Sequence, residues 1–135
     1  WQMMKYPDTE NANDPRNSYE GWVFTRNEIA LMHGWEAKKA GDQANKIMKE
    51  NGIKWISYKG RRFDYKDFAS GSAFHYQIIS EAILQKVLQN NAIRRLLMQT
   101  KGLNLIPDHH FKKQKPQSYY YHHILMSIRD NLLEK

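Results

Sequence analysis

Residues 73–88 read Ala-Phe-His-Tyr-Gln-Ile-Ile-Ser-Glu-Ala-Ile-Leu-Gln-Lys-Val-Leu, and their apolar side chains recur at every third or fourth position. This period is typical of a helix that buries one wide face. Asp67 and Ser70 are the candidate caps at its start, and Asn90-Asn91 breaks it. The stretch therefore predicts a long amphipathic helix.

Patterns elsewhere in the chain also favour helices. They predict one helix from Asn27 to about Gly41 and a second from an Asp42 cap to Lys49. A third helix is predicted over 92–99, with Ile93, Leu96 and Leu97 facing inward. A fourth is predicted over 118–133, where the apolar stripe consists of Tyr121, Ile124, Leu125, Ile128 and Leu132. Short extended segments are expected at 53–58 and 103–106, a loop at 7–18 and a basic turn at 59–62. We therefore expect a mostly α fold (α+β with minor strand content), a single compact helical domain over residues 1–135.

Composition excludes several classes of protein. The 135 residues contain no cysteine, which rules out disulfides, thiolate nucleophiles and cysteine-ligated zinc. No apolar run approaches the roughly 18 residues that span a bilayer, and no signal peptide is visible. We expect a cytoplasmic protein with no membrane partner.

The net charge of +7 favours anionic partners such as nucleotides, phosphates or nucleic acid. Cations gather in three clusters, of which the first contains Lys59, Arg61, Arg62 and Phe63. The others are Arg94-Arg95 and Lys112, Lys113 and Lys115. Guanidinium groups hold phosphates and aromatic rings stack on bases, but solvated basic faces look the same in a sequence. Both interpretations stay open.

Proton-transfer groups are concentrated in residues 108–123, which contain four of the six histidines. These four are His109, His110, His122 and His123; histidine as a residue type can transfer protons near neutral pH, and Asp108 is next to His109, where a carboxylate could orient an imidazole. No HExxH, P-loop or Gly-x-Ser-x-Gly spacing occurs, so we expect no metal, no cofactor and no serine hydrolase triad. Glu81 is either a partly buried acid with a raised pKa or a surface acid paired with Gln85.

Residues 81–107, residues 121–129 and the pair Gln2 and Lys5 resemble stretches of the NADAR family of N-glycosidases. Residues 81–107 match a family pattern: a helix with a lysine near its end, a Gln-Asn-like turn, a Leu-Leu-x-x-Thr-Gly helix end and an extended Leu-Val-Glu. Those places are held by Lys86, Gln89, Asn90, Leu96, Leu97, Thr100, Leu105 and Ile106. Residues 121–129 resemble the closing family helix, Leu-Gly-x-Leu-Leu-Met-x-Ile-Arg. Gln2 and Lys5 resemble the end of an early Glu-His-x-x-Gln-x-x-Lys helix, so we expect an upstream N-terminal portion to be missing.

The chain departs from this pattern where the family keeps site residues. Lys101 replaces the Gly of Thr-Gly, Pro107 replaces the last Glu, and Tyr119 stands near the family's Asn. The segment from Asp108 onward is therefore either a rebuilt glycosidase site or a vacated one.

The resemblance implies hydrolysis of an N-glycosidic bond in an ADP-ribosylated or phosphoribosylated substrate, either a small nucleotide-like molecule or one attached to nucleic acid. It implies that Asp108 stands in for the missing Glu and that His109 or His110 assists proton transfer. Gln2, Lys5, Arg61, Arg62 and Tyr119 would bind the substrate. The alternatives are a catalytically silent nucleotide- or nucleic-acid-binding module and a structural subunit; the oligomeric state stays open.

Overall fold

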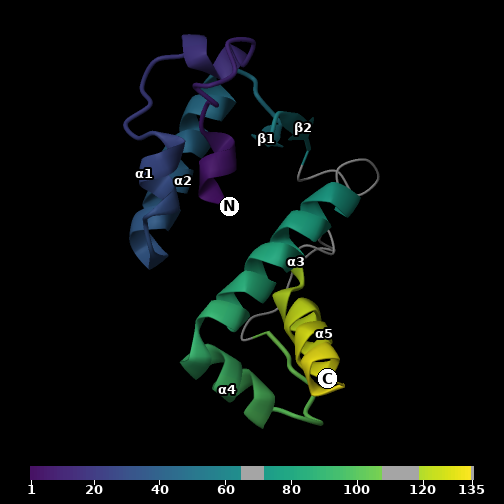
Figure 1. Cartoon of the computed structure of the whole chain (residues 1–135). Coiled ribbons are helices and arrows are strands. Elements are labelled where there is room, and N and C mark those ends of the chain that lie inside the picture. Colours follow the sequence, from purple (N-terminus) through teal and green to yellow (C-terminus); the bar gives the residue numbers. More distant parts are fainter. Residues whose placement is uncertain (65–71, 108–118, 135) are drawn as a thin grey trace. The chain divides into compact units, whose positions relative to one another are not determined.

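The computed structural model of the chain describes residues 1–64, 72–107 and 119–134. In these ranges helices predominate and a two-stranded sheet is the minor β component, which confirms the predicted mostly α fold. Contacts between residues divide the chain into two compact units, Trp1–Asp64 and Tyr65–Lys135 (Figure 1). That residues 1–135 form one domain stays a prediction.

The first unit combines short helices with a β-hairpin. Its elements are the 3-10 helices η1 (Gln2–Lys5) and η2 (Pro15–Ser18), the α-helices α1 (Arg26–Ala30) and α2 (Gly34–Glu50), and the strands β1 (Ile56–Tyr58) and β2 (Arg61–Phe63). The short η1 helix contacts α1, α2 and β1. Elements from most of the unit therefore pack around this N-terminal turn.

The core of the first unit lies between η1 and α2. Tyr6, Ile29, Ala40 and Ala44 are buried there, with Met3, Trp22, Phe24 and Met32 packed against them. Ala40 and Ala44 lie one turn apart on α2, and their small side chains let η1 approach closely. The hydroxyl of Tyr6 donates a hydrogen bond of 2.8 Å to the carbonyl of Ala40, so this buried polar group is paired.

The predicted helix from Asn27 to about Gly41 is wrong in two ways: it begins one residue earlier, at Arg26, and it is interrupted after Ala30. Thr25 is the N-cap: its hydroxyl accepts from the amide of Glu28, and the Glu28 carboxylate accepts from the amide of Thr25. This reciprocal capping box satisfies two amides that the first helical turn leaves unpaired. The helix it begins, α1, is short and ends at Ala30.

The predicted helix boundary at Gly41–Asp42 is also wrong. Helix α2 begins at Gly34 and runs without interruption to Glu50. Gly41 is buried in its interior, where a Cβ atom would collide with the carboxamide of Gln2. The glycine therefore serves a close approach between η1 and α2, and it does not end the helix.

The hairpin is antiparallel, with Ile56 opposite Phe63, Ser57 opposite Arg62 and Tyr58 opposite Arg61. Lys59 and Gly60 connect the strands with φ values of 50° and 75°. Two consecutive positive φ angles are typical of the type I′ turn, whose twist matches that of the strands. The turn predicted at 59–62 therefore contains only residues 59 and 60, because Arg61 and Arg62 belong to β2.

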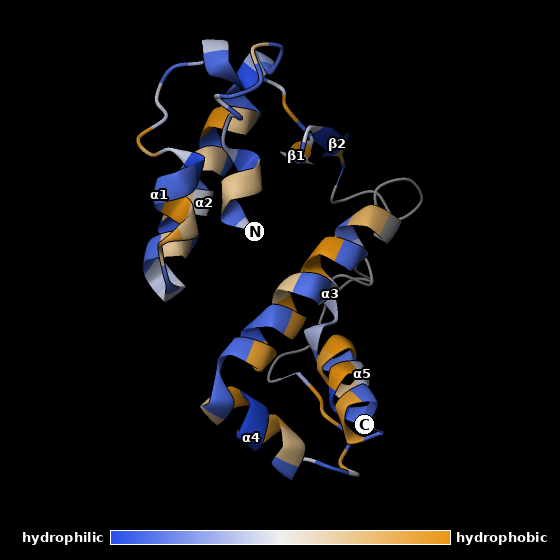
Figure 2. Cartoon of the chain, in the orientation of Figure 1, coloured by the Kyte–Doolittle hydropathy of each residue, from blue (hydrophilic) through white to orange (hydrophobic). Residues whose placement is uncertain are grey.

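The second unit contains the helices α3 (Ser72–Gln89), α4 (Asn91–Gln99) and α5 (Tyr121–Leu133), each of which contacts the other two. Apolar residues recur along all three helices (Figure 2). Ile79, Val87, Leu97 and Ile124 are buried. The α5 stripe is confirmed for Ile124, with Leu125, Ile128 and Leu132 half-buried, whereas Tyr121 is 52% exposed. Leu96 is 65% exposed, so its predicted inward position is wrong.

Arg129 of α5 ties that helix to the end of α4. Its side chain is buried, and one guanidinium nitrogen donates to the carbonyls of Thr100 and Leu103, each at 2.9 Å. The Thr100 carbonyl is one of those that the end of a helix leaves without an intrahelical partner. Arg129 therefore caps α4 from another helix and fixes the segment that follows it.

We expect the substitution Arg129→Met to destabilise the second unit by about 2–3 kcal/mol, because hydrogen bonds from a charged donor are lost and buried carbonyls remain. Urea unfolding measures the change. The matched control is Arg95→Met on the exposed surface of α4, which should stay within about 0.5 kcal/mol of the native chain. Equal effects of the two substitutions would contradict a capping role.

Candidate functional site

The residues predicted to form one site divide between the two units. Gln2, Lys5, Arg61 and Arg62 lie in the first unit, and Tyr119 lies in the second. The predicted catalytic residues Asp108, His109 and His110 lie outside the described residues. Each group is therefore a separate candidate.

Gln2 and Lys5 are directed into the protein. Lys5 is only 6% exposed. The Gln2 carboxamide occupies the space left by Gly41, and its buried Oε1 has no hydrogen-bond partner among the described residues. Burying an amide oxygen in this way costs free energy. The carboxamide of Gln2 is thus held by the shape of its surroundings.

A buried arginine pair links the hairpin to the N-terminal turn. Arg16 is fully buried and binds Asp14 through two nitrogens, at 3.0 and 2.8 Å. It also donates to the carbonyl of Met4 and to the hydroxyl of Ser57. Arg26 donates to that hydroxyl at 2.8 Å and to the carbonyls of Ser57 and Tyr6. Two guanidinium groups thus meet at Ser57.

Charge and burial act in opposite directions at this arginine pair. Burial alone would raise the pKa of Asp14, but hydrogen bonds from the Arg16 side chain and from backbone amides outweigh it and hold that pKa below its usual value. Burial, and secondarily the charge of Arg16, lowers the pKa of Arg26. Asp14 is therefore the counter-ion that makes the burial of Arg16 possible.

Trp55 connects this buried pair to the protein surface. The guanidinium carbons of Arg16 and Arg62 lie 4.5 and 4.1 Å from the centre of its ring. Arg62 is exposed, and it also donates a long hydrogen bond of 3.4 Å to the carbonyl of Asn13. The aromatic ring therefore orients a surface cation.

Arg61 and Arg62 lie on opposite faces of the hairpin, because consecutive strand residues alternate. Arg62 shares its face with Ser57, and Arg61 shares the other face with Tyr58. A single phosphate on one face can therefore meet only one of the two arginines directly.

Tyr119 of the second unit lies beside a histidine that the sequence analysis did not single out. Its ring is edge-on to that of His75 on α3, with the centroids 6.1 Å apart. His75 is 1% exposed, and burial lowers its pKa to about 4. The imidazole is therefore neutral at physiological pH and can act there as a hydrogen-bonding group rather than as a cation.

Two further histidines stack at the start of α5. The rings of His122 and His123 have centroids 4.2 Å apart, and Tyr120 stacks on His123 at 5.6 Å. Burial, followed by the charge of His123, lowers the pKa of His122. Aromatic and imidazole groups thus gather directly after the segment in which Asp108, His109 and His110 lie.

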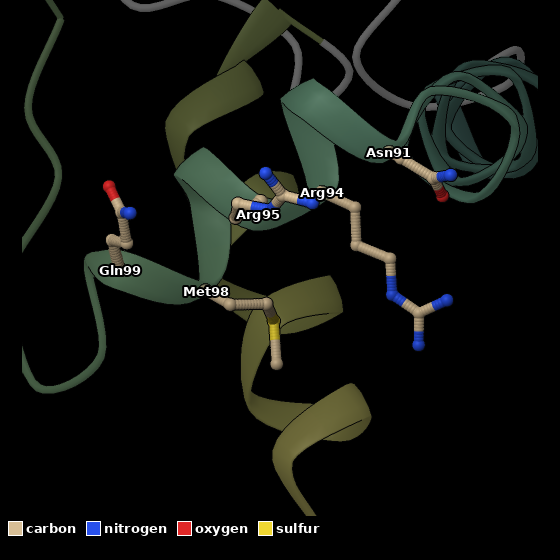
Figure 3. Close-up of a pocket in the computed structure, with 5 residues that line it drawn as sticks. All are labelled: Asn91, Arg94, Arg95, Met98 and Gln99. Carbon is tan, nitrogen blue, oxygen red and sulfur yellow. The ribbon is translucent and has the colours of Figure 1, made fainter.

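The second predicted basic cluster lines an open hollow on α4 of about 540 Å³. Its lining residues are Asn91, Arg94, Arg95, Met98 and Gln99, all from this helix (Figure 3). The side chains of Arg94 and Gln99 extend away from each other. A hollow built from one helix face offers a ligand little enclosure, so this cluster is a solvated basic surface.

One alternative left open by the sequence, the environment of Glu81, is resolved by the structure. Glu81 is exposed and accepts a hydrogen bond of 2.9 Å from Gln85, so it is a surface acid.

No group of three potential ligands that could hold a metal ion occurs among residues 1–64, 72–107 and 119–134. In the same part of the chain no helix is long and apolar enough to cross a bilayer.

The residues missed by sequence reasoning were Arg16, Arg26, Trp55, Ser57 and His75. Asp14-Pro15-Arg16 did carry a signal, because an aspartate followed by proline is typical of a helix N-cap. His75 carried none, since its burial depends on the packing of α3 within the unit.

Comparisons of the chain with protein-family models, curated proteins and solved structures found no match. The resemblance to the NADAR family therefore stays a prediction.

The contact between Gln2 and Gly41 can be measured as a coupling free energy. Gly41→Ala gains up to about 1 kcal/mol of helix propensity, but in the native chain it must displace the Gln2 side chain. We expect this stabilisation to appear in a Gln2→Ala background and to be reduced or reversed in the native background. Urea unfolding of the four variants gives the coupling. Equal effects in both backgrounds would show that the two residues do not interact.

Burial of neutral His75 predicts a loss of stability in mild acid. The unfolded chain binds a proton near pH 6.5 and the folded chain only near pH 4, so the free energy of unfolding falls as pH decreases between these values. The loss between pH 7 and pH 4.5 is on the order of 2–3 kcal/mol. His75→Gln should remove it, whereas His33→Gln, at an exposed histidine, should not. Unfolding at pH 7 and pH 4.5 tests this, and a similar loss in His75→Gln would contradict it.

Proposed function

We propose that the chain is a NADAR-type hydrolase that cleaves an N-glycosidic bond of an ADP-ribosylated or phosphoribosylated substrate. Water adds to C1′ of the ribose, the bond from C1′ to the leaving nitrogen breaks, and that nitrogen receives a proton. Asp108 positions the water and stabilises the oxocarbenium-like state, and His109 or His110 transfers the proton. These roles follow from the resemblance, and no bound metal or cofactor takes part.

The observation that supports the proposal is the set of hydrogen bonds between two stretches that carry the resemblance. Arg129, in the stretch that resembles the closing family helix, binds Thr100 in the Leu-Leu-x-x-Thr stretch. The amide of Leu105 contacts the sulfur of Met126 at 3.3 Å. The residues that lead into the 108–118 segment are therefore fixed to the helix that follows it. Rigid support on both sides is what a catalytic segment needs.

The substrate-binding part of the proposal depends on charge. A diphosphate carries negative charge that the exposed Arg61 or Arg62 would balance, whereas Lys5 is buried and does not reach a ligand. Tyr119, beside neutral His75, offers an aromatic face and a polar edge to a ribose or a base.

A catalytically silent nucleotide-binding module is the second candidate. The exposed Lys54, Lys59 and Arg62 favour it, because they serve binding without any need for Asp108. A silent module would bind ADP-ribose and release nothing from an ADP-ribosylated substrate.

Incubating the full chain with ADP-ribosylated DNA and ADP-ribosylated protein, and measuring free ADP-ribose by mass spectrometry, distinguishes the two functions. We expect Asp108→Asn to reduce the rate of release by about 100-fold or more, the range of positioned acid–base groups. Asp42→Asn is the matched control, because Asp42 is exposed on α2 with only a surface ion pair to Lys38. Absence of release would rule out the hydrolase, whereas equal rates for Asp108→Asn and the native chain would rule out the catalytic role of Asp108.

A further inference from the structure

We infer that the hairpin of β1 and β2 binds single-stranded nucleic acid, with one unpaired base stacked on the guanidinium group of Arg62. This inference concerns a surface of the first unit and holds whether or not the chain is a hydrolase. It also gives the nucleotide-binding function a specific ligand and a specific residue.

The Arg62 side chain forms a planar platform. Its guanidinium group lies over Trp55 at 4.1 Å, so one face of that plane is covered by an aromatic ring. The same side chain donates the long hydrogen bond of 3.4 Å to the carbonyl of Asn13. Because Arg62 is nevertheless exposed, its outer face is available to a ligand. Arginine planes held in this way stack on unpaired bases.

The cations around this platform are suited to a phosphate backbone. Lys54 and Lys59 are exposed, and the Lys59 ammonium lies 5.4 Å from the ring of Tyr58. Residues 51–63 contain no carboxylate, and Asp14 is already bound by Arg16. Strand β2 is accordingly one of the most hydrophilic segments in Figure 2. Lys54, Lys59 and Arg62 therefore present positive charge along this segment, which lies between Glu50 and Asp64.

The combination of a stacking plane and point charges favours a single strand over other anions. An acidic peptide would use the charges but not the plane, and a duplex keeps its bases inside the stack. Each strand has three residues, or about 10 Å. This length suits two or three nucleotides, so we expect two or three phosphate contacts.

The test measures binding of the full chain to a labelled decathymidylate and to an abasic decamer of the same charge by fluorescence anisotropy. We expect the bases to tighten binding roughly tenfold, the effect of one stacked base. Arg62→Ala should abolish this difference, so that both oligomers bind the variant equally. Arg62→Lys, which keeps the charge but not the plane, should also abolish it. Decauridylate and its abasic counterpart distinguish RNA from DNA as the ligand.

Salt dependence tests the phosphate contacts. The slope of log K against log salt concentration should lie between about −1.4 and −2.1, and Lys59→Gln should reduce its magnitude by about 0.7. The matched control is Lys46→Gln, an exposed lysine on α2, which should leave the slope unchanged.

The following results would overturn the inference. The native chain could bind the thymidylate and abasic oligomers equally. Alternatively, the ratio of the affinities for these two oligomers could be the same in both Arg62 variants as in the native chain. If Arg94→Ala lowers the affinity as much as Arg62→Ala does, the binding site includes α4 and is not specific to the hairpin. Tighter binding of duplex than of single strand, or equal competition by polyglutamate, would exclude base stacking. Because none of these ligands carries ADP-ribose, failure here is distinct from failure of the hydrolase.

Discussion

The first unit depends on the need to pair the buried guanidinium of Arg16. An unpaired charge in that position would cost several kcal/mol, so the surrounding segments are arranged to supply acceptors. Asp14 comes from the loop, Met4 from η1 and Ser57 from β1. Arg26 then uses the same Ser57 hydroxyl from α1. One buried ion pair thus determines how four segments meet, including a loop that would otherwise have little reason to be ordered.

The second unit uses an arginine for a related purpose. Arg129 also satisfies backbone carbonyls from a distance, but its acceptors are those exposed by the end of α4. In both units, therefore, irregular backbone is held by a long cationic side chain that reaches across from another element. This arrangement agrees with the basic composition of the chain, since part of its positive charge has a structural role and is unavailable to a ligand.

Sequence patterns predicted those features that depend on neighbours along the chain. The helix at 73–88 and the stripe of α5 were predictable because helical periodicity determines which face is buried. Gly41 was misinterpreted, because a glycine that ends a helix and one that admits a neighbour look identical without the partner, Gln2. The arginine cluster of the first unit could not be predicted either, since Arg16 and Ser57 are 41 positions apart. The grouping of Tyr119 with His75 depends likewise on tertiary packing.

The two-residue turn at Lys59-Gly60 has an evolutionary consequence. Exposed turns commonly tolerate insertions, but the pairing of Ser57 with Arg62 requires this turn length. One additional residue would shift the register and exchange the faces of Arg61 and Arg62. Arg62 would then leave Trp55, although its own codon had not changed. Descendants of this chain that keep the hairpin's surface should therefore vary very little in the number of residues between the strands.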